Sequence, residues 1–480
     1  MDRDLFANRR MNPQQRLRKA SQTARGFNSG VCASATSLVE TRRASVTSPR
    51  QFWGEVGDSW TAVPSTNLRV GAPRRGRSGL RLLRMAAVLA MAGCGRTVAP
   101  APSSDGWMGT WAAAQQLTEP RNLPPAPGLA GSTLRQVVQV SVGGERVRVR
   151  FSNQFGTRPL TLAAVGVAAS TGASAIDVAT DREVSFAGAA SVTLAPGATV
   201  VSDPLRYTLP PLSRVAVTVH IADAPEEVTG HPGSRTTSYL QRGNAVSAPL
   251  LDGAASAEHW YLLAGIDVPA EGRAAVAVLG NSITDGRGSG TDRQNRWPDH
   301  LARRLQSSPR TARVAVLNMG IGGNRVLRGG LGPPALERFD RDVAERSGVR
   351  WLIVLEGVND IGEARGAEEA AATARELIAA YRWMIARAHA RGIRAYGATI
   401  LPFGGSFYDS PEREAARQTV NEWIRTGGEW DAVIDLDAAL RDPASPTRLR
   451  PEADTGDHLH PNEAGHRMMG EAVELALFAR

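Results

Sequence analysis

The sequence predicts two folded regions, an all-β sandwich followed by an α/β region built on a parallel sheet. From residue 107 to 267, short apolar runs alternate with polar residues at a period of two, and clusters of Gly, Pro and Ser separate them, which is typical of antiparallel sheets. From residue 274 to 480, uninterrupted apolar runs alternate with longer stretches of helical period, which is typical of a parallel sheet covered by helices. The connection over residues 268–273 is short, so we expect the two regions to pack against each other.

The first region is expected to open with a β-hairpin. Residues 134–142 and 146–151 are both strand-like, and a Gly-Gly pair separates them, which favours a tight turn between paired strands. Arg146, Arg148 and Arg150 alternate with apolar residues in the second run, which predicts one solvated face. Further strands are expected at residues 160–167, 184–186, 189–194, 205–209 and 214–221.

The second region is expected to alternate strands and helices along the chain, which predicts parallel pairing. Strands are expected at residues 274–280, 314–319, 351–355, 393–400 and 432–436. Helices are expected at residues 297–305, 334–345, 367–390, 411–426 and 461–479.

The N-terminal part is interpreted as a leader. Residues 1–84 carry 16 basic and 5 acidic residues, against a net charge of +9 for the whole chain. The folded regions therefore have no basic excess, and we expect no nucleic-acid partner. Residues 1–73 show no sustained period and are either a disordered extension or the product of a mis-assigned translation start.

Residues 74–94 have the layout of a secretory signal, with arginines, an apolar segment and then small residues. The sequence Met-Ala-Gly-Cys that ends at Cys94 resembles a bacterial lipoprotein cleavage box, in which this cysteine is lipidated; a plain signal peptide is the alternative. Residues 95–106 form a Pro/Ala/Ser linker. We therefore expect a secreted, extracytoplasmic protein that touches a membrane only through a lipid anchor at Cys94. Both cysteines precede the folded regions, which excludes a disulfide framework there.

Four polar, glycine-bearing turns are expected at strand ends or helix entrances of the second region. Because parallel sheets bind their ligands at the carboxyl ends of the strands, these turns should meet at one edge. They are residues 280–286 (GNSITDG), 317–324 (LNMGIGGN), 355–360 (LEGVND) and 456–461 (GDHLHP).

The residues in these turns fit nucleophilic catalysis. A serine needs a base, and the base needs an acceptor that orients it. Ser282 would be the nucleophile, with His460 as its base and Asp457 as the acceptor. An oxyanion needs preorganised donors, and the Ser282 N–H, a glycine N–H from the second turn and the Asn359 amide would supply them.

This order of motifs resembles that of the SGNH hydrolases, the GDSL-type esterases and lipases, over the second region. The resemblance implies a flavodoxin-like sheet, an acyl-enzyme mechanism and no cofactor or metal. It also implies that Ser282, His460 and Asp457 are the catalytic residues, and that Gly323 and Asn359 donate to the oxyanion together with the Ser282 N–H. Segments 109–113 and 148–156 are similar to segments that precede the catalytic domain in a secreted bacterial group of this family.

The first motif departs from the family, because Asn281 stands where an aspartate is usual. Asparagine keeps local hydrogen bonds but loses the charge. Asp285 and Asp360 are expected to fix turns and cap helices.

The sequence therefore predicts a secreted or lipid-anchored serine esterase acting on short-chain acyl esters, including esters linked to carbohydrate. Phe403, Phe407 and Tyr408 follow a predicted strand and are candidate substrate contacts. Two alternatives stay open. One is a surface carbohydrate-binding protein with a degenerate esterase domain, and the other is an acyltransferase that uses the same site.

Overall fold

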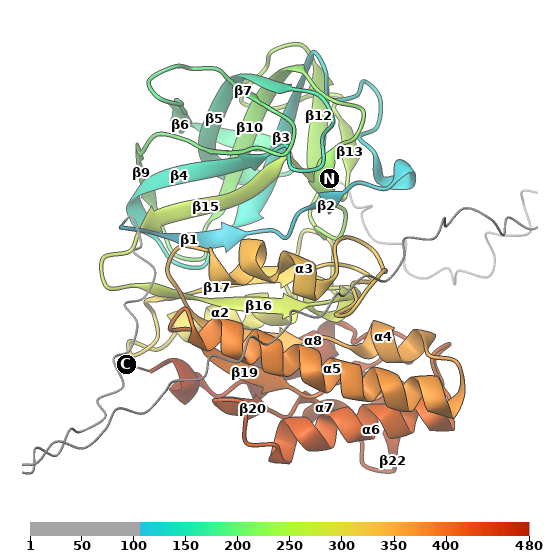
Figure 1. Cartoon of the computed structure of the whole chain (residues 1–480). Coiled ribbons are helices and arrows are strands. Elements are labelled where there is room, and N and C mark those ends of the chain that lie inside the picture. Colours follow the sequence, from blue (N-terminus) through green and yellow to red (C-terminus); the bar gives the residue numbers. More distant parts are fainter. Residues whose placement is uncertain (1–105, 480) are drawn as a thin grey trace, which may run out of the picture. The chain divides into compact units, whose positions relative to one another are not determined.

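The computed structural model describes residues 106–479 of the chain (Figure 1). These residues fall within a single structural unit. The predictions for the leader, the signal segment, the lipidated Cys94 and nearly all of the linker lie outside the described residues. None of the described helices combines the length and the apolar character that crossing a membrane requires.

The first region consists of antiparallel sheets, of which the two larger ones form the layers seen in Figure 1. One runs in the order β13(Ala255–Ala257), β12(Ser238–Arg242), β3(Ser132–Gln139), β10(Arg214–Asp223), β5(Leu160–Gly172), β6(Ala175–Glu183), with β7(Val192–Leu194) on β5. The other runs in the order β1(Trp107–Ala112), β15(Leu263–Pro269), β4(Gly144–Ser152), β8(Thr199–Val201), with β9(Leu205–Leu209) on β4. A small third sheet joins β14(Trp260–Tyr261), β11(Thr229–His231) and β2(Gln116–Leu117).

The expected hairpin between residues 134–142 and 146–151 is wrong. β3 pairs with β10 and β12, whereas β4 pairs with β15 in the other sheet. The Gly-Gly pair therefore carries the chain from one sheet to the other, and a Cβ atom at Gly143 would overlap the Leu209 carbonyl oxygen. β3 is buried along nearly its whole length, as a strand covered on both faces must be.

Two other expectations for this region also fail. Residues 184–186 form only an isolated bridge between Phe186 and Ala189. Arg148 and Arg150 do not lie on a solvated face, because both pair with Asp267 of β15, at 3.2 and 2.6 Å. Asp267 is buried, and a buried carboxylate requires such partners.

The second region is built on a parallel sheet in the order β17(Val314–Gly320), β16(Ala274–Gly280), β18(Val349–Leu355), β19(Arg394–Ala398), β20(Ala432–Ile434). Numbered along the chain, this is the order 2-1-3-4-5 of flavodoxin-like folds, so the predicted fold class is confirmed. Every residue of β16 is buried. The strand order reverses beside β16, and ligands of such sheets bind at that point.

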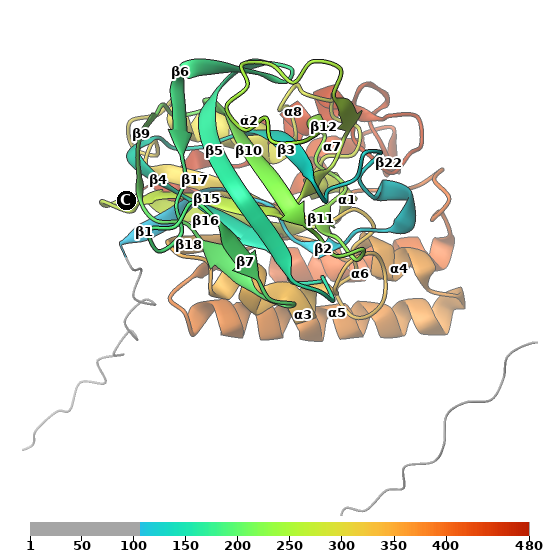
Figure 2. The ribbon, with the colours of Figure 1, turned by 90° about the horizontal axis from the view of Figure 1, so that it is seen from above.

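Helices cover both faces of this sheet, and Figure 2 shows α3 and α5 on one side with α2 and α8 on the other. The expected helix over residues 334–345 is divided into a short α-helix and a π-helical turn, and the last helix ends at Ala472. The sequence pattern did not predict α1, α4, α7 or the hairpin β21(Arg441–Asp442)–β22(Ser445–Leu449). The helices are α1(Ser282–Asp285), α2(Trp297–Gln306), α3(Ala335–Phe339), α4(Val358–Glu363), α5(Gly366–His389), α6(Pro411–Thr426), α7(Leu436–Leu440) and α8(Glu463–Ala472).

The two regions meet where β1 packs against β17. The Ser141 hydroxyl donates to the Val316 carbonyl oxygen at 2.9 Å and accepts from the Val316 N–H at 3.1 Å. The Gly109 N–H donates to the Ser347 carbonyl oxygen at 3.3 Å. These bonds engage backbone groups of the second region that would otherwise need water.

Arg338 of α3 joins the carboxyl ends of neighbouring strands. Its guanidinium donates to the carbonyl oxygens of Met319 at 2.7 Å and of Gly280 at 3.1 Å, which lie at the ends of β17 and β16. Its Nε donates to the Asn324 side-chain oxygen at 3.0 Å. A planar guanidinium has its donors in a fixed fork, so these contacts fix the spacing of the strand ends.

Two buried carboxyl groups contact the Arg338 guanidinium. Asp342 pairs with the guanidinium at 3.1 Å and Glu356 at 3.5 Å, and all three side chains are buried. Burial raises the pKa of Glu356 to about 8, although the Arg338 charge opposes the shift. Removing one member of such a group leaves an uncompensated buried charge.

We expect Arg338→Met to lower the free energy of unfolding by about 3–5 kcal/mol, because it strands buried carboxylates and carbonyl oxygens. Urea unfolding followed by circular dichroism measures this loss. The matched control is Arg328→Met, because Arg328 is exposed and pairs with Glu376 on the surface, so its cost should stay below about 1 kcal/mol. Equal losses in the two variants would contradict a central role for Arg338.

Candidate active site

The turn after β16 presents Ser282 at the carboxyl end of a buried strand. Ser282 begins α1, and the Asn281 side-chain oxygen caps that helix by accepting from the Ile283 N–H at 3.1 Å. A Cβ atom at Gly280 would overlap the Thr284 side chain, so only glycine lets the chain fold back so tightly here. The Ser282 side chain is thereby held at the start of a helix, where backbone N–H groups point outward.

In the structure, the three predicted catalytic side chains form one line of consecutive hydrogen-bond contacts. The Ser282 Oγ lies 2.8 Å from the His460 Nε2, and the His460 Nδ1 lies 2.7 Å from the Asp457 Oδ2. Asp457 and His460 come from the loop before α8. The Nδ1–H donates to the carboxylate, which leaves Nε2 free to accept the serine proton.

The pKa values of this line suit a base that is neutral near pH 7. Burial would raise the pKa of Asp457, but the backbone N–H groups of His460 and Leu459 and the His460 ring hold it well below its usual range. Burial lowers the pKa of His460, and the Asp457 carboxylate only partly offsets that shift. The imidazole is therefore unprotonated at neutral pH, as a general base must be.

The predicted oxyanion donors converge beside Ser282. Gly323 has a φ of +69° and lines the same hollow as Ser282 and Asn359. The Asn359 amide donates to the Asn324 carbonyl oxygen at 2.7 Å, and its oxygen accepts from the Tyr408 hydroxyl at 3.2 Å. These two bonds fix the amide orientation and leave its second N–H for an oxyanion.

Of the three candidate aromatic contacts, only Phe407 is openly exposed to the hollow. Its exposed fraction is 71%, whereas Phe403 is fully buried and does not line the hollow. We therefore no longer expect Phe403 to contact a substrate. Tyr408 lines the hollow but is largely buried, and its hydroxyl serves to orient Asn359.

The hollow above Ser282 has a volume of about 370 Å³ and is shared between the two regions. Its far wall comes from the first region, with Gln116, Arg121, Asn122, Arg235 and His259 among the residues that line it. None of these residues was predicted from the sequence to belong to the site. These are isolated polar residues in strands and turns, and they form no recognisable motif in the sequence. Only the packing of the two regions places them beside Ser282.

One buried contact ties this wall to the nucleophile turn. The His231 Nε2 lies 2.9 Å from the Asp285 Oδ1, and the His231 Nδ1 lies 2.9 Å from the Ala114 carbonyl oxygen. Both ring nitrogens of His231 are therefore engaged, one by each region. A Cβ atom at Gly233 would overlap the Asp285 carboxyl group. Asp285 was expected to fix its own turn, and the structure shows that it reaches across to the first region instead.

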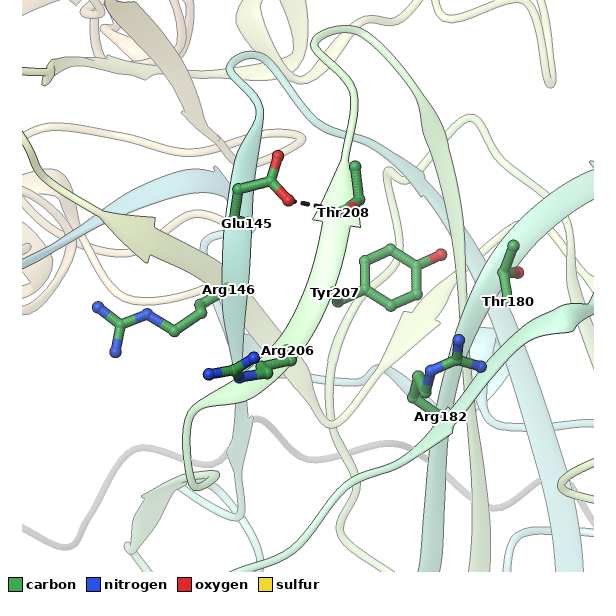
Figure 3. Close-up of a pocket in the computed structure, with 7 residues that line it drawn as sticks. All are labelled: Glu145, Arg146, Thr180, Arg182, Arg206, Tyr207 and Thr208. Atoms are coloured by element: carbon green, nitrogen blue, oxygen red, sulfur yellow. Dashed lines mark hydrogen bonds between the residues drawn. The ribbon is translucent and has the colours of Figure 1, made fainter.

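A larger hollow, of about 730 Å³, lies on the first region and contains none of the predicted site residues. Figure 3 shows Tyr207 at its centre, with Arg182 on one side and Arg146 and Arg206 pointing away on the other. Glu145 accepts from the Thr208 hydroxyl at 2.8 Å. Among the residues that line this hollow there is no histidine, and hence no Ser–His–Asp line like the one at Ser282.

Metal chemistry has no evident site in this part of the chain: within residues 106–479, no group of three or more His, Cys, Asp and Glu side chains is arranged to hold an ion.

A flavodoxin-like sheet that carries a Ser–His–Asp line at its carboxyl edge defines the class of serine hydrolases with this fold. Residues 278–468 match the family described as GDSL-like lipase/acylhydrolase. The C-terminal region is therefore a hydrolase domain of the GDSL-like, or SGNH, type, and esters are the substrates that this family implies.

Solved structures similar to the chain cover less than half of it. A protein of the G-D-S-L lipolytic family from Desulfitobacterium hafniense is 22% identical, with a TM-score of 0.32, over 42% of this chain and 97% of that chain. The acetylxylan esterase Axe2 from Geobacillus stearothermophilus is 21% identical, with a TM-score of 0.33, over 42% of this chain and 91% of that chain. No curated protein matches the chain.

The contact of the Asn281 side chain explains why an asparagine fits at the position where the family usually has an aspartate. Its Nδ2 donates to the Glu356 Oε2 at 3.3 Å, so an aspartate there would set two carboxyl groups against each other. Because Glu356 has a pKa of about 8, it can keep its proton below that pH and donate to the new carboxylate.

We expect Asn281→Asp to change kcat/KM by less than about tenfold near pH 6–7, and to lose activity at alkaline pH, where the shared proton leaves. Measuring kcat/KM on an aryl acetate from pH 6 to 10 tests this. Glu356→Gln in the Asn281→Asp background should remove the alkaline loss, since glutamine is a permanent donor. An alkaline loss that persists in the double variant would contradict this account.

The His231–Asp285 contact predicts that the first region positions the nucleophile. We expect His231→Gln to lower kcat by about 10- to 100-fold with little change in KM, because α1 loses an anchor next to Ser282. The double variant with Asp285→Asn should cost about as much as either single variant, since the two act as a unit.

Kinetics normalised to the serine titrated by a covalent inhibitor measure both variants. The matched control is His389→Gln, because His389 pairs with Asp431 at 2.8 Å on the surface, away from the site. Additive losses from His231 and Asp285, or an equal loss from His389, would contradict the coupling.

Proposed function

We propose that this protein is a serine esterase that hydrolyses short-chain acyl esters, including esters of carbohydrate hydroxyls, through an acyl-enzyme. The observation that carries the proposal is the line of contacts from the Ser282 Oγ through His460 to Asp457, at 2.8 and 2.7 Å. The line ends at a hollow that also contains Gly323 and Asn359.

The acylation step follows from this geometry. The His460 Nε2 takes the proton of Ser282 as Oγ attacks the ester carbonyl carbon, and the carbonyl electron pair moves onto oxygen. The N–H groups of Ser282 and Gly323 and the free N–H of Asn359 stabilise that oxyanion. When it collapses, the C–O bond to the alcohol breaks, and the alcohol oxygen receives the proton from His460.

Deacylation reverses these roles. Water enters in place of the alcohol, His460 removes its proton, and the resulting hydroxide forms the new bond to the acyl carbon. The C–O bond to Ser282 then breaks, the serine oxygen regains its proton, and the carboxylic acid leaves. Asp457 stays ionised throughout and stabilises the imidazolium form of His460.

The walls of the hollow favour a small acyl group on a polar alcohol. A volume of about 370 Å³ suits a small ligand. Its apolar lining is limited to side chains such as Leu331, Phe407 and Leu459, and amide, guanidinium and imidazole groups make up the far wall. Such groups match the hydroxyls of a sugar better than a long acyl chain.

The proposal places the enzyme outside the cytoplasm. Its support is the signal-like segment 74–94, with Cys94 at a lipoprotein-type cleavage box. Intact-mass analysis of the mature protein tests the anchor, since a lipidated Cys94 would add the mass of acyl chains to a product that begins at that residue.

We expect Ser282→Ala and His460→Ala each to lower kcat/KM by about 10⁴-fold or more, because the residues of such a line act as a unit. A series of aryl esters from acetate to octanoate, run beside acetylated oligosaccharides, measures the rates and the chain-length preference. Because burial lowers the pKa of His460, the neutral base persists to lower pH, and the acid limb should have its midpoint below about 6.5.

The matched control is Ser289→Ala, because Ser289 lies nearby, does not line the hollow and bonds only the Gly286 carbonyl oxygen. Circular dichroism checks that all variants are folded. If Ser282→Ala keeps most of the wild-type rate, the proposal is wrong, and a wild type inert on every ester would favour a carbohydrate-binding role.

A further inference from the structure

Two arginines from different regions border the catalytic base. Arg235 lies between β11 and β12 of the first region, and Arg287 follows α1 in the second. Both line the hollow above Ser282, and the charge of each helps to lower the pKa of His460. The two guanidinium groups therefore lie on the His460 side of the site.

Arg235 is held in a conformation that a side chain rarely adopts. Its φ is +52°, in the left-handed region, and its carbonyl oxygen accepts from the Asp292 N–H at 2.9 Å. Its neighbours Ser234 and Thr236 are buried and bonded to each other. A strained backbone conformation of this kind persists only where surrounding contacts hold it in place, and such conformations are concentrated at functional sites. Within the described residues, the buried Arg235 Nε has no hydrogen-bond partner.

Arg287 is fixed through its backbone while its side chain stays 60% exposed. Its N–H donates to the Ser282 carbonyl oxygen at 2.9 Å, and its own carbonyl oxygen lies 3.0 Å from the His466 Nε2. Because the His466 Nδ1 accepts from the Trp297 N–H at 3.2 Å, Nε2 carries the proton and donates. The guanidinium of Arg287 comes only within 4.0 Å of Asp457, whose carboxylate already holds His460.

The carboxylates around the hollow are already bonded to other groups. Arg121, Arg235 and Arg287 face it together with the carboxylates of Glu119 and Asp457. Gln116 and Asn122 each donate to Glu119 at 2.8 Å, so that carboxylate is already satisfied. The Asp285 carboxyl group is bonded to the buried His231 ring at 2.9 Å, so it too already has a partner. The Arg235 Nε remains without a partner within the described residues, and Arg235 lines the hollow together with His460.

The chemistry of the reaction says which part of the substrate meets the Arg235 and Arg287 guanidinium groups. The leaving alcohol takes its proton from the His460 Nε2, so its oxygen lies within hydrogen-bond distance of that atom. Groups that flank His460 therefore contact the alcohol part of the ester, whereas the carbonyl oxygen faces Gly323 and Asn359.

Building on the proposed esterase function, we infer that the natural substrate carries an anionic oxyacid group, a carboxylate or a phosphate, on its alcohol part, bound by Arg235 and Arg287. A guanidinium binds such a group through two parallel N–H donors. The arrangement favours acylated acidic sugars over acylated neutral ones.

The first test compares an aryl acetate that bears a ring carboxylate with its carboxamide isostere. The ratio of their kcat/KM values should favour the carboxylate by about tenfold or more and fall as salt is added. In Arg235→Gly the preference should be lost, while the Tm should not fall, because glycine adopts a positive φ without strain. A merely structural role for Arg235 would give the opposite pattern, a lower Tm with the preference kept.

The matched control is Arg293→Gln, and the second measurement is the pH dependence of kcat/KM. Arg293→Gln should leave the preference within about threefold of wild type, because Arg293 is exposed, pairs with Glu463 and does not line the hollow. Removing the Arg235 charge should also move the acid limb of kcat/KM to higher pH, since that charge opposes protonation of His460.

Acetylated methyl glucuronoside, acetylated glucose 6-phosphate and acetylated methyl glucoside then distinguish the source of the anion. A preference for either charged sugar that Arg235→Gly abolishes supports the inference. Equal rates on all three sugars, or a preference that Arg235→Gly leaves intact, would overturn it. A wild type that hydrolyses no ester in a Ser282-dependent way would instead overturn the proposed function itself.

Discussion

The buried guanidinium of Arg338 is the interaction on which the site depends. It bonds carbonyl oxygens at the ends of β16 and β17, the Asn324 side chain and the Glu356 carboxyl group that follows β18. The turns that carry Ser282, Gly323 and Asn359 all begin at those strand ends. A charge buried this deeply is costly unless every donor has an acceptor, so the same contacts that satisfy Arg338 also hold the three turns at a fixed spacing. Catalysis by oriented donors requires that spacing to be rigid.

The site is complete only when both regions are present. The region of the parallel sheet carries Ser282, His460, Gly323 and Asn359, and the antiparallel region supplies the wall that faces them. The His231–Asp285 pair connects the wall to α1 at 2.9 Å. The first region is thus a part of the candidate site rather than a separate attachment.

Local signals in the sequence predicted what depends on local physics. Three features depend only on residues close together in the sequence: the uninterrupted apolar run of β16, the glycine-bearing turn after it, and the spacing of Asp457 and His460. Each of them lies where it was expected.

The predictions that failed depend on contacts between distant segments. The Gly-Gly pair at residues 143 and 144 looks like a hairpin turn, yet β3 and β4 pair with strands far along the chain. His231 and Arg235 belong to no recognisable motif. They lie about fifty residues before Ser282 in the sequence, and only tertiary packing brings them close to it. The fully buried Phe403 shows the same limit, since an aromatic residue after a strand suits a core as well as a pocket.

The contact between Ser141 and Val316 has a consequence for the lone catalytic region. β17 is the outer strand of the parallel sheet, so one of its edges has no neighbouring strand in that sheet. At Val316 on that edge, the Ser141 hydroxyl both donates to the backbone and accepts from it, as a neighbouring strand would. Without the first region, this strand would present unpaired backbone groups along an apolar edge, which is a template for pairing with another molecule. The antiparallel region thus also guards the protein against self-association, and a fragment cut at the junction would be prone to aggregate through β17.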